Sequence, residues 1–135
     1  MGEPNGRPAL PPAHKTILVV EDDVLIRFMI ADDLMASGYK IIQAATADEA
    51  LRVLQSSTHL DLILTDIRMP GSMDGLALAA RVRAQWPHLK IIVLSGDLPA
   101  LSATIPADAF LPKPYSASAV LICVKQLLSS DDGAF

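Results

Sequence analysis

Short runs of apolar residues alternate with longer segments of mixed polarity along most of the chain. The runs occupy residues 15–20, 39–45, 61–65 and 90–95, and a shorter one lies within 109–114. Runs that are apolar on both faces are typical of buried strands in parallel sheets, which helices cover on both sides. The pattern therefore predicts a doubly wound α/β domain built on a five-stranded parallel sheet.

The segments between the runs carry helix signals. Residues 24–37 place Leu25, Phe28 and Met29 at helical spacing and are followed by Gly38, a residue that commonly ends a helix. A second helix begins after Thr46, which has capping-box spacing to Glu49.

Two more helices are expected in the second half of the chain. Residues 74–86 form one, which Pro87 stops because proline disfavours helical geometry in the residue before it. Ser116 is expected to cap the other, which runs to about Leu128. Residues 96–108 contain two prolines and are expected to form a short helix at best.

Composition and charge narrow the class of protein. Apolar residues make up 51% of the 135 residues, but no run approaches the length of a membrane helix. The net charge of −4 gives no general electrostatic reason to bind nucleic acid. One cysteine, Cys123, excludes an internal disulfide, and the N-terminus lacks a signal-peptide pattern. We therefore expect a cytoplasmic protein with a proline-rich tail at 1–14, a single domain at 15–129 and a polar tail at 130–135.

Polar residues follow the predicted strands at their carboxyl ends, which is where doubly wound sheets bind ligands. The first strand delivers Glu21, Asp22 and Asp23, the third Asp66, the fourth Ser95 and the fifth Lys113. The second strand delivers only alanines, as expected of an edge strand.

Carboxylates that converge on one crevice repel one another unless a cation offsets their charge. Oxygen ligands of this kind suit Mg²⁺, which is bound through one or two carboxylates and keeps water molecules that a phosphate can replace. Lys113 offers a compact positive charge for a phosphoryl oxygen, and Ser95 offers a hydroxyl donor. Asp66 is then placed as a nucleophile, since carboxylates can form aspartyl phosphates.

At these residues the sequence resembles the receiver domain of bacterial response regulators, the family of the chemotaxis regulator. The motifs that carry the resemblance are "ILVVEDD" with Arg27 following, "LILTDIRMPGSMDG", "IIVLSG" and "FLPKP", and they cover residues 15–128. The resemblance implies a flavodoxin-like fold with strand order 2-1-3-4-5.

The resemblance also implies roles for individual residues. Asp66 corresponds to the phosphoacceptor. Asp22, Asp66 and the backbone carbonyl of Arg68 would bind Mg²⁺ directly, and Glu21 would act through water. Asp23 matches no ligand position and is assigned to capping the first helix.

Three further positions match the family toward the C-terminus. Ser95 stands where the family has threonine or serine, and Lys113 is the family's catalytic lysine. Phe110 stands at the aromatic switch position, so Ser95 and Phe110 form the expected switch pair. The Lys113–Pro114 bond corresponds to the family's cis peptide.

The implied function is a phosphorylation-dependent switch of a two-component system. A histidine kinase or phosphotransfer protein would phosphorylate Asp66, and the output would be binding to a downstream protein, with a homodimer also compatible. No direct nucleic-acid or membrane partner and no turnover of a separate substrate are expected. The chain reads as a stand-alone receiver; a phosphate-relay or sink receiver, or one cut from a larger regulator or hybrid kinase, is the alternative.

The sequence departs from the family in two places. Ser72 lengthens the loop after Asp66 by one residue, and the interval from Ser95 to Lys113 is shorter by roughly one helical turn. The second departure puts the family's usual output face in doubt and predicts local mobility.

Two other classes of protein are alternatives. A haloacid-dehalogenase-like phosphatase needs a second acid two residues after the nucleophile, where this chain has Arg68. An unphosphorylated scaffold of receiver shape would be expected to lack an acid, the nucleophile or the lysine, and all are present.

Overall fold

The computed structural model describes residues 15–69, 71, 73–95 and 106–132. In chain order the elements are β1 (Thr16–Val20), α2 (Val24–Ala36), β2 (Lys40–Ala44), α3 (Ala47–Gln55), β3 (Leu62–Asp66), α4 (Gly75–Gln85), β4 (Lys90–Ser95), β5 (Ala109–Pro112) and α6 (Ala117–Asp132). Within these residues, every helix is too short or too polar to cross a lipid bilayer.

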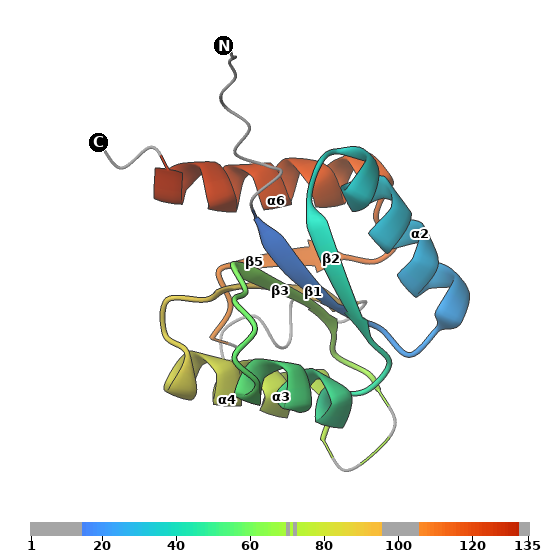
Figure 1. Ribbon diagram of the computed structural model, residues 1–135. Helices are drawn as coiled ribbons and strands as arrows, with labels where there is room; N and C mark the ends of the chain where they lie inside the picture. The colour runs from blue at the N-terminus through green and yellow to red at the C-terminus, as the bar shows by residue number, and fades with distance from the viewer. Residues whose placement is uncertain (1–14, 70, 72, 96–105, 133–135) are drawn as a thin grey trace.

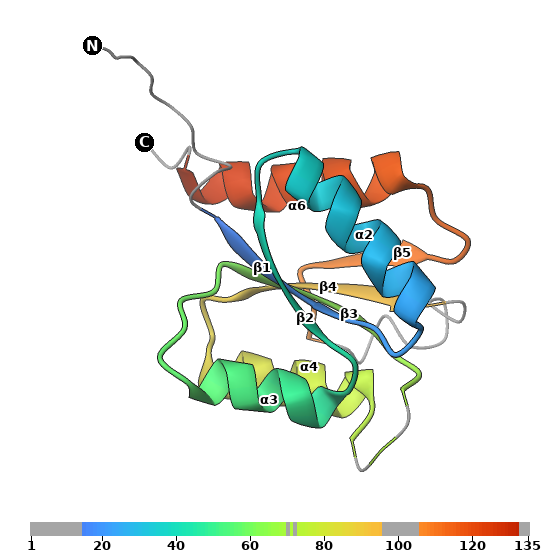
Figure 2. The same cartoon turned by 45° about the vertical axis from the view of Figure 1, so that its right-hand side comes forward.

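The five strands form one parallel sheet in the order β2-β1-β3-β4-β5, which confirms the predicted fold class. Helices α2 and α6 cover one face of the sheet, and α3 and α4 cover the other (Figure 1). The turned view in Figure 2 separates these two helical layers from the sheet between them. This arrangement explains why the strands are apolar on both sides.

Strand β1 contributes side chains to both hydrophobic cores, one on each face of the sheet. Leu18 and Val20 pack with α3 and α4, whereas Ile17 and Val19 pack with α2 and α6. All four side chains are at most 1% exposed. Because successive side chains of a strand point to opposite faces, an unbroken apolar run is needed when both faces are covered.

The predicted helix starts are confirmed by their hydrogen bonds. The Asp23 carboxylate accepts from the Ile26 amide at 3.0 Å and caps α2. The Thr46 hydroxyl accepts from the Glu49 amide at 3.1 Å, and the Ser116 hydroxyl accepts from the Ala119 amide at 3.0 Å. Each bond satisfies an amide that has no partner inside its own helix.

The apolar residues whose spacing predicted α2 do not lie on the buried face of the helix. Leu25 is 69% exposed, Phe28 51% and Met29 58%, while the residues that enter the core are Ile30, Ala31 and Leu34. The helix is apolar on more than one side, so spacing alone could not identify the buried face.

Helix α6 ends at Asp132 rather than near Leu128, so its last turn enters the region predicted to be a polar tail. Four other predictions concern the tail at 1–14, the loop residue Ser72, the segment 96–105 and the terminal residues 133–135, all of which lie outside the described residues. The domain limits therefore stay predictions.

Candidate functional site

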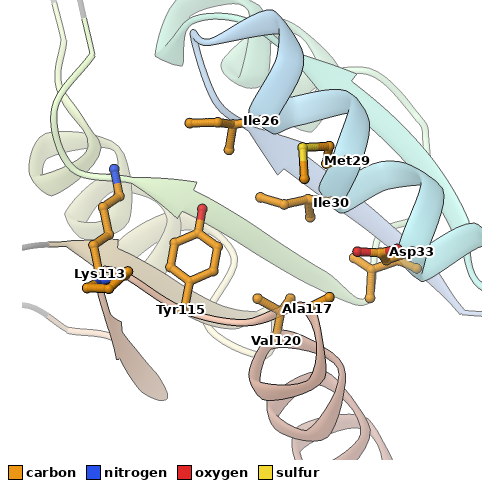
Figure 3. Close-up of a pocket in the computed structure, with 10 residues that line it drawn as sticks. Ile26, Met29, Ile30, Asp33, Lys113, Tyr115, Ala117 and Val120 are labelled. Carbon is orange, nitrogen blue, oxygen red and sulfur yellow. The ribbon is translucent and has the colours of Figure 1, made fainter.

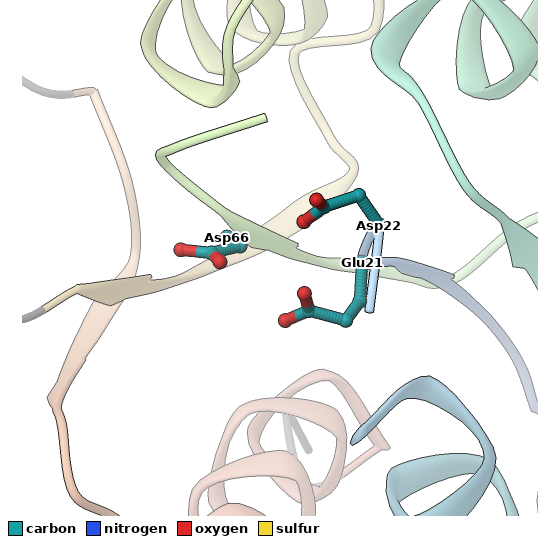
Figure 4. Close-up of side chains that lie close together, drawn as sticks. All are labelled: Glu21, Asp22 and Asp66. Carbon is teal, nitrogen blue, oxygen red and sulfur yellow. The ribbon is translucent and has the colours of Figure 1, made fainter. Parts of the chain in front are cut away.

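Three carboxylates meet where β1 and β3 end. Val20 is paired with Thr65 in the parallel register, so the next residues, Glu21 just beyond β1 and Asp66 at the end of β3, follow side by side. Glu21, Asp22 and Asp66 each offer one carboxylate oxygen, and these oxygens lie within 4.8 Å of one another (Figure 4). The register of the sheet thus brings together the acids that the sequence predicted at this edge.

Lys113 contacts one of these carboxylates. Its Nζ lies 2.9 Å from Oδ2 of Asp66, whose side chain is only 7% exposed. The ammonium gives this buried carboxylate a charged hydrogen-bond partner, and a carboxylate can act as a nucleophile. The sequence predicted both members of this pair.

Glu21 is the most deeply buried carboxylate of the cluster. It is 2% exposed; its Oε2 accepts from the Asp23 amide at 3.1 Å, but its Oε1 is buried and, among the described residues, has no hydrogen-bond partner. Burial is the main cause that raises its pKa to about 7, and the carboxylates of Asp66 and Asp22 act in the same direction.

A bound cation would supply the partner that this Glu21 oxygen lacks among the described residues. A buried carboxylate oxygen without a partner is costly, and a divalent ion or its water molecules would satisfy it and offset the charges of all three acids. The donor set contains oxygen atoms alone, which fits Mg²⁺. The residues present therefore fit the implied metal.

The other predicted site residues lie around this cluster. Ser95, 3% exposed, ends β4, and its carbonyl accepts from the Lys113 amide at 3.0 Å. Arg68 is exposed just beyond β3. Phe110 is partly buried on β5 and packs against the core beneath α3 and α4. The Lys113–Pro114 peptide is cis, as the resemblance implied.

A groove of about 550 Å³ opens beside Lys113, between α2 and the start of α6. Its walls include Ile26, Met29 and Val120, and the Tyr115 ring stands in it next to the Lys113 side chain (Figure 3). Burial raises the pKa of Tyr115 to about 12, and the charges of Glu21 and Asp66 add to that shift.

Sequence reasoning assigned no role to Tyr115, nor to Gly75 and Arg27, although both of these contact the backbone of site residues. Gly75 lies against Asp66, and Arg27 donates to the carbonyl of Glu21. The position of Tyr115, directly after the Lys113–Pro114 motif, was a signal for its placement. Arg27 and Gly75 stand in the motifs that carry the family resemblance, but the motifs do not show what the two residues contact, because those contacts join different elements of the fold.

Residues 17–125 match the response regulator receiver domain family. The sensor kinase CckA of Brucella abortus is 35% identical over 122 residues, and the DNA-binding transcriptional regulator NtrC of Salmonella typhimurium is 35% identical over 117 residues. These matches cover 87% and 84% of this chain but only 13% and 24% of the two relatives. The chain thus spans a small part of the length of these proteins.

Solved structures resemble the fold closely. A CheY-like receiver domain protein from Methanospirillum hungatei has a TM-score of 0.79 and 30% identity, with 87% of this chain and 96% of that chain covered. The response regulator TrrA of Thermotoga maritima, solved in complex with Mg²⁺ and BeF, has a TM-score of 0.76 and 34% identity, with 84% and 98% covered. The chain therefore belongs to the response regulator receiver domain family, the phosphorylation-dependent signalling domains of two-component systems.

Proposed function

We propose that Asp66 accepts a phosphoryl group from a phosphohistidine donor, with Mg²⁺ held by Asp22, Asp66 and the Arg68 carbonyl and contacted by Glu21 through water. The observation that carries this proposal is the position of Asp66. Its buried carboxylate lies between two other acids and the Lys113 ammonium. The occurrence of Mg²⁺ and BeF together in the TrrA structure supports the same kind of site.

Asp66, Lys113 and Ser95 have different roles in the transfer. An Asp66 oxygen attacks phosphorus, the P–N bond to the donor imidazole breaks, and the electron pair of that bond leaves with the imidazole. Bound Mg²⁺ would offset the charge on the phosphoryl oxygens. Lys113 gives one of these oxygens an ammonium partner, and the Ser95 hydroxyl, at the end of the neighbouring strand β4, donates to another. No separate substrate is turned over.

Exposed apolar side chains beside the site support a protein as the donor. Val24, Leu25, Phe28 and Met29 at the start of α2 are all more than half exposed. A donor whose phosphohistidine reaches Asp66 must cover the surface around the site, and apolar contacts there would stabilise the encounter. We propose a histidine kinase or a phosphotransfer protein as this partner.

The output is proposed to be contact with a downstream protein, switched by Ser95 and Phe110. The two residues lie on neighbouring strands, β4 and β5, and Ser95 is linked to Lys113 by a backbone hydrogen bond of 3.0 Å. A relay or sink role, and a place within a larger regulator or kinase, are compatible with the same chemistry. The relatives CckA and NtrC are longer proteins of those two kinds.

Intact-mass analysis after incubation with acetyl phosphate and Mg²⁺ tests the phosphoacceptor. Wild type and Asp32→Asn, which removes an exposed acid from α2, should each gain one phosphoryl group, and Asp66→Asn should gain none. Omission of Mg²⁺ should abolish the label in wild type and in Asp32→Asn. Equal labelling of Asp66→Asn would place the phosphoryl group on another residue.

A further inference from the structure

Arg27 joins three parts of the fold next to the acidic cluster. From the first turns of α2, its Nη1 donates to the carbonyl oxygen of Glu21 at 2.8 Å. Its Nε donates to Oε1 of Gln43 on β2 at 3.1 Å. The guanidinium carbon lies 5.7 Å from the centroid of the Phe28 ring. The planar guanidinium is therefore held in one orientation while it binds the Glu21 carbonyl.

The bond to Glu21 controls the path of the chain as it leaves β1. The Glu21 amide donates to the Ala44 carbonyl at 3.1 Å, so β2 holds one side of this residue and Arg27 holds the other. The peptide that follows leads directly to Asp22, whose side chain is exposed. Because little packing restrains Asp22, the direction of its carboxylate depends on the orientation of that peptide.

We infer that Arg27 is a positioning residue of the metal site: it fixes the peptide between Glu21 and Asp22 so that both carboxylates face Asp66. This inference rests on the proposed Mg²⁺ site. It makes Arg27 act on the cation through the backbone, without contact to the cation or the phosphoryl group.

The direction in which Mg²⁺ affinity changes when Arg27 is replaced distinguishes a positioning role from a purely electrostatic one. Arg27 carries a positive charge close to a site for a cation, so charge alone predicts that its removal strengthens Mg²⁺ binding. Positioning predicts the opposite, because a peptide that is free to turn holds Asp22 in the binding orientation for only part of the time.

The test is a calorimetric titration of Mg²⁺ into wild type and four variants. Arg27→Met removes the donors and keeps an apolar stem, Arg27→Lys keeps the charge, and Gln43→Met removes the second anchor of the guanidinium. Arg52→Met is the matched control, because it removes the same charge from an exposed position on α3. Thermal unfolding without Mg²⁺ is measured on every protein.

We expect Arg27→Met to bind Mg²⁺ about tenfold more weakly than wild type, the loss typical of residues that orient metal ligands. Arg27→Lys and Gln43→Met should lie between the two, and Arg52→Met should match wild type. A change in unfolding temperature alone, with Mg²⁺ affinity unchanged, would overturn the positioning role.

Other outcomes are equally decisive. Tighter binding by Arg27→Met would show that Arg27 acts through its charge. Equal losses in Arg27→Met and Arg52→Met would show that the loss is not specific to Arg27, and would also overturn the positioning role. If Arg27→Met does not fold, wild-type affinity in both Arg27→Lys and Gln43→Met would overturn the inference. Failure of wild type to bind Mg²⁺ would instead refute the metal site itself, and with it any role of Arg27 there.

Discussion

Replacing Gly75 with alanine should damage the phosphoacceptor without touching its side chain. Gly75 opens α4, and its amide donates to the Ile67 carbonyl at 2.8 Å. A Cβ at this position would lie 2.0 Å from the carbonyl oxygen of Asp66 and 2.7 Å from the Cα of Ile67. Both neighbours are backbone atoms, so no side-chain rotation can make room.

The structure sets the size of the effect. Carbon and oxygen atoms in close contact are normally separated by roughly 3.3 Å or more, so α4 and the end of β3 must move apart by about 1 Å. Forcing extra atoms into a packed region costs about 1–3 kcal/mol, and a rigid backbone neighbour favours the upper end. A displacement of this size at a reacting group can slow a reaction on the order of 100-fold.

Urea unfolding and the rate of labelling by acetyl phosphate with Mg²⁺ measure the two effects. Gly71→Ala is the matched control: Gly71 has φ of 107°, and its added Cβ would meet no atom of the described residues within 4 Å. That variant should lose about 1–2 kcal/mol through its backbone conformation and still be labelled at nearly the wild-type rate. Wild-type stability and labelling in Gly75→Ala would refute the close packing of α4 against Asp66.

Two further predictions concern Glu21 and the apolar start of α2. The folded-state pKa of Glu21, about 7, exceeds its ordinary value of 4.5, so between these pH values the folded state keeps a proton that the unfolded state has lost. Without Mg²⁺, the free energy of unfolding should therefore fall as pH rises through this window, and less so in Glu21→Gln; identical pH profiles would contradict the assignment. Leu25→Gln should slow phosphotransfer from a phosphohistidine protein but not from acetyl phosphate. Met35→Gln, at the other end of α2, should slow the reaction with neither donor. Equal slowing of Leu25→Gln with both donors would argue against a docking role.

The sheet and the chemistry at its edge could be predicted because each rests on a local pattern. A run such as Leu62-Ile63-Leu64 is apolar on both faces and is fully buried, an environment that only a central strand between two helical layers provides. Once the strands are parallel, their carboxyl ends must meet at one edge, and the residues found there follow directly. Asp66 and Lys113, 47 positions apart, are in contact for this reason.

The faces of the helices could not be predicted in the same way. In α2 the apolar residues surround much of the helix, so burial of Leu34 and exposure of Leu25 are decided by where α6 and the sheet lie. That arrangement depends on long-range packing, which overrides the local pattern. The exposed Leu25, Phe28 and Met29 lie in the first two turns of α2, which follow Glu21 and Asp22 closely along the chain.

The site is built from residues that supply chemistry and residues that supply geometry. Asp22 and Asp66 provide the carboxylates, yet the peptide before Asp22 is held by Arg27, and the end of β3 lies against Gly75. Neither contact is visible in the spacing of the acids. A chain could therefore keep every acid and the lysine and still bind Mg²⁺ poorly, if a larger side chain stood at 75 or a shorter one at 27. Identity at the acidic positions alone is consequently a weaker indicator of phosphorylation than those positions together with the two residues that hold their backbone.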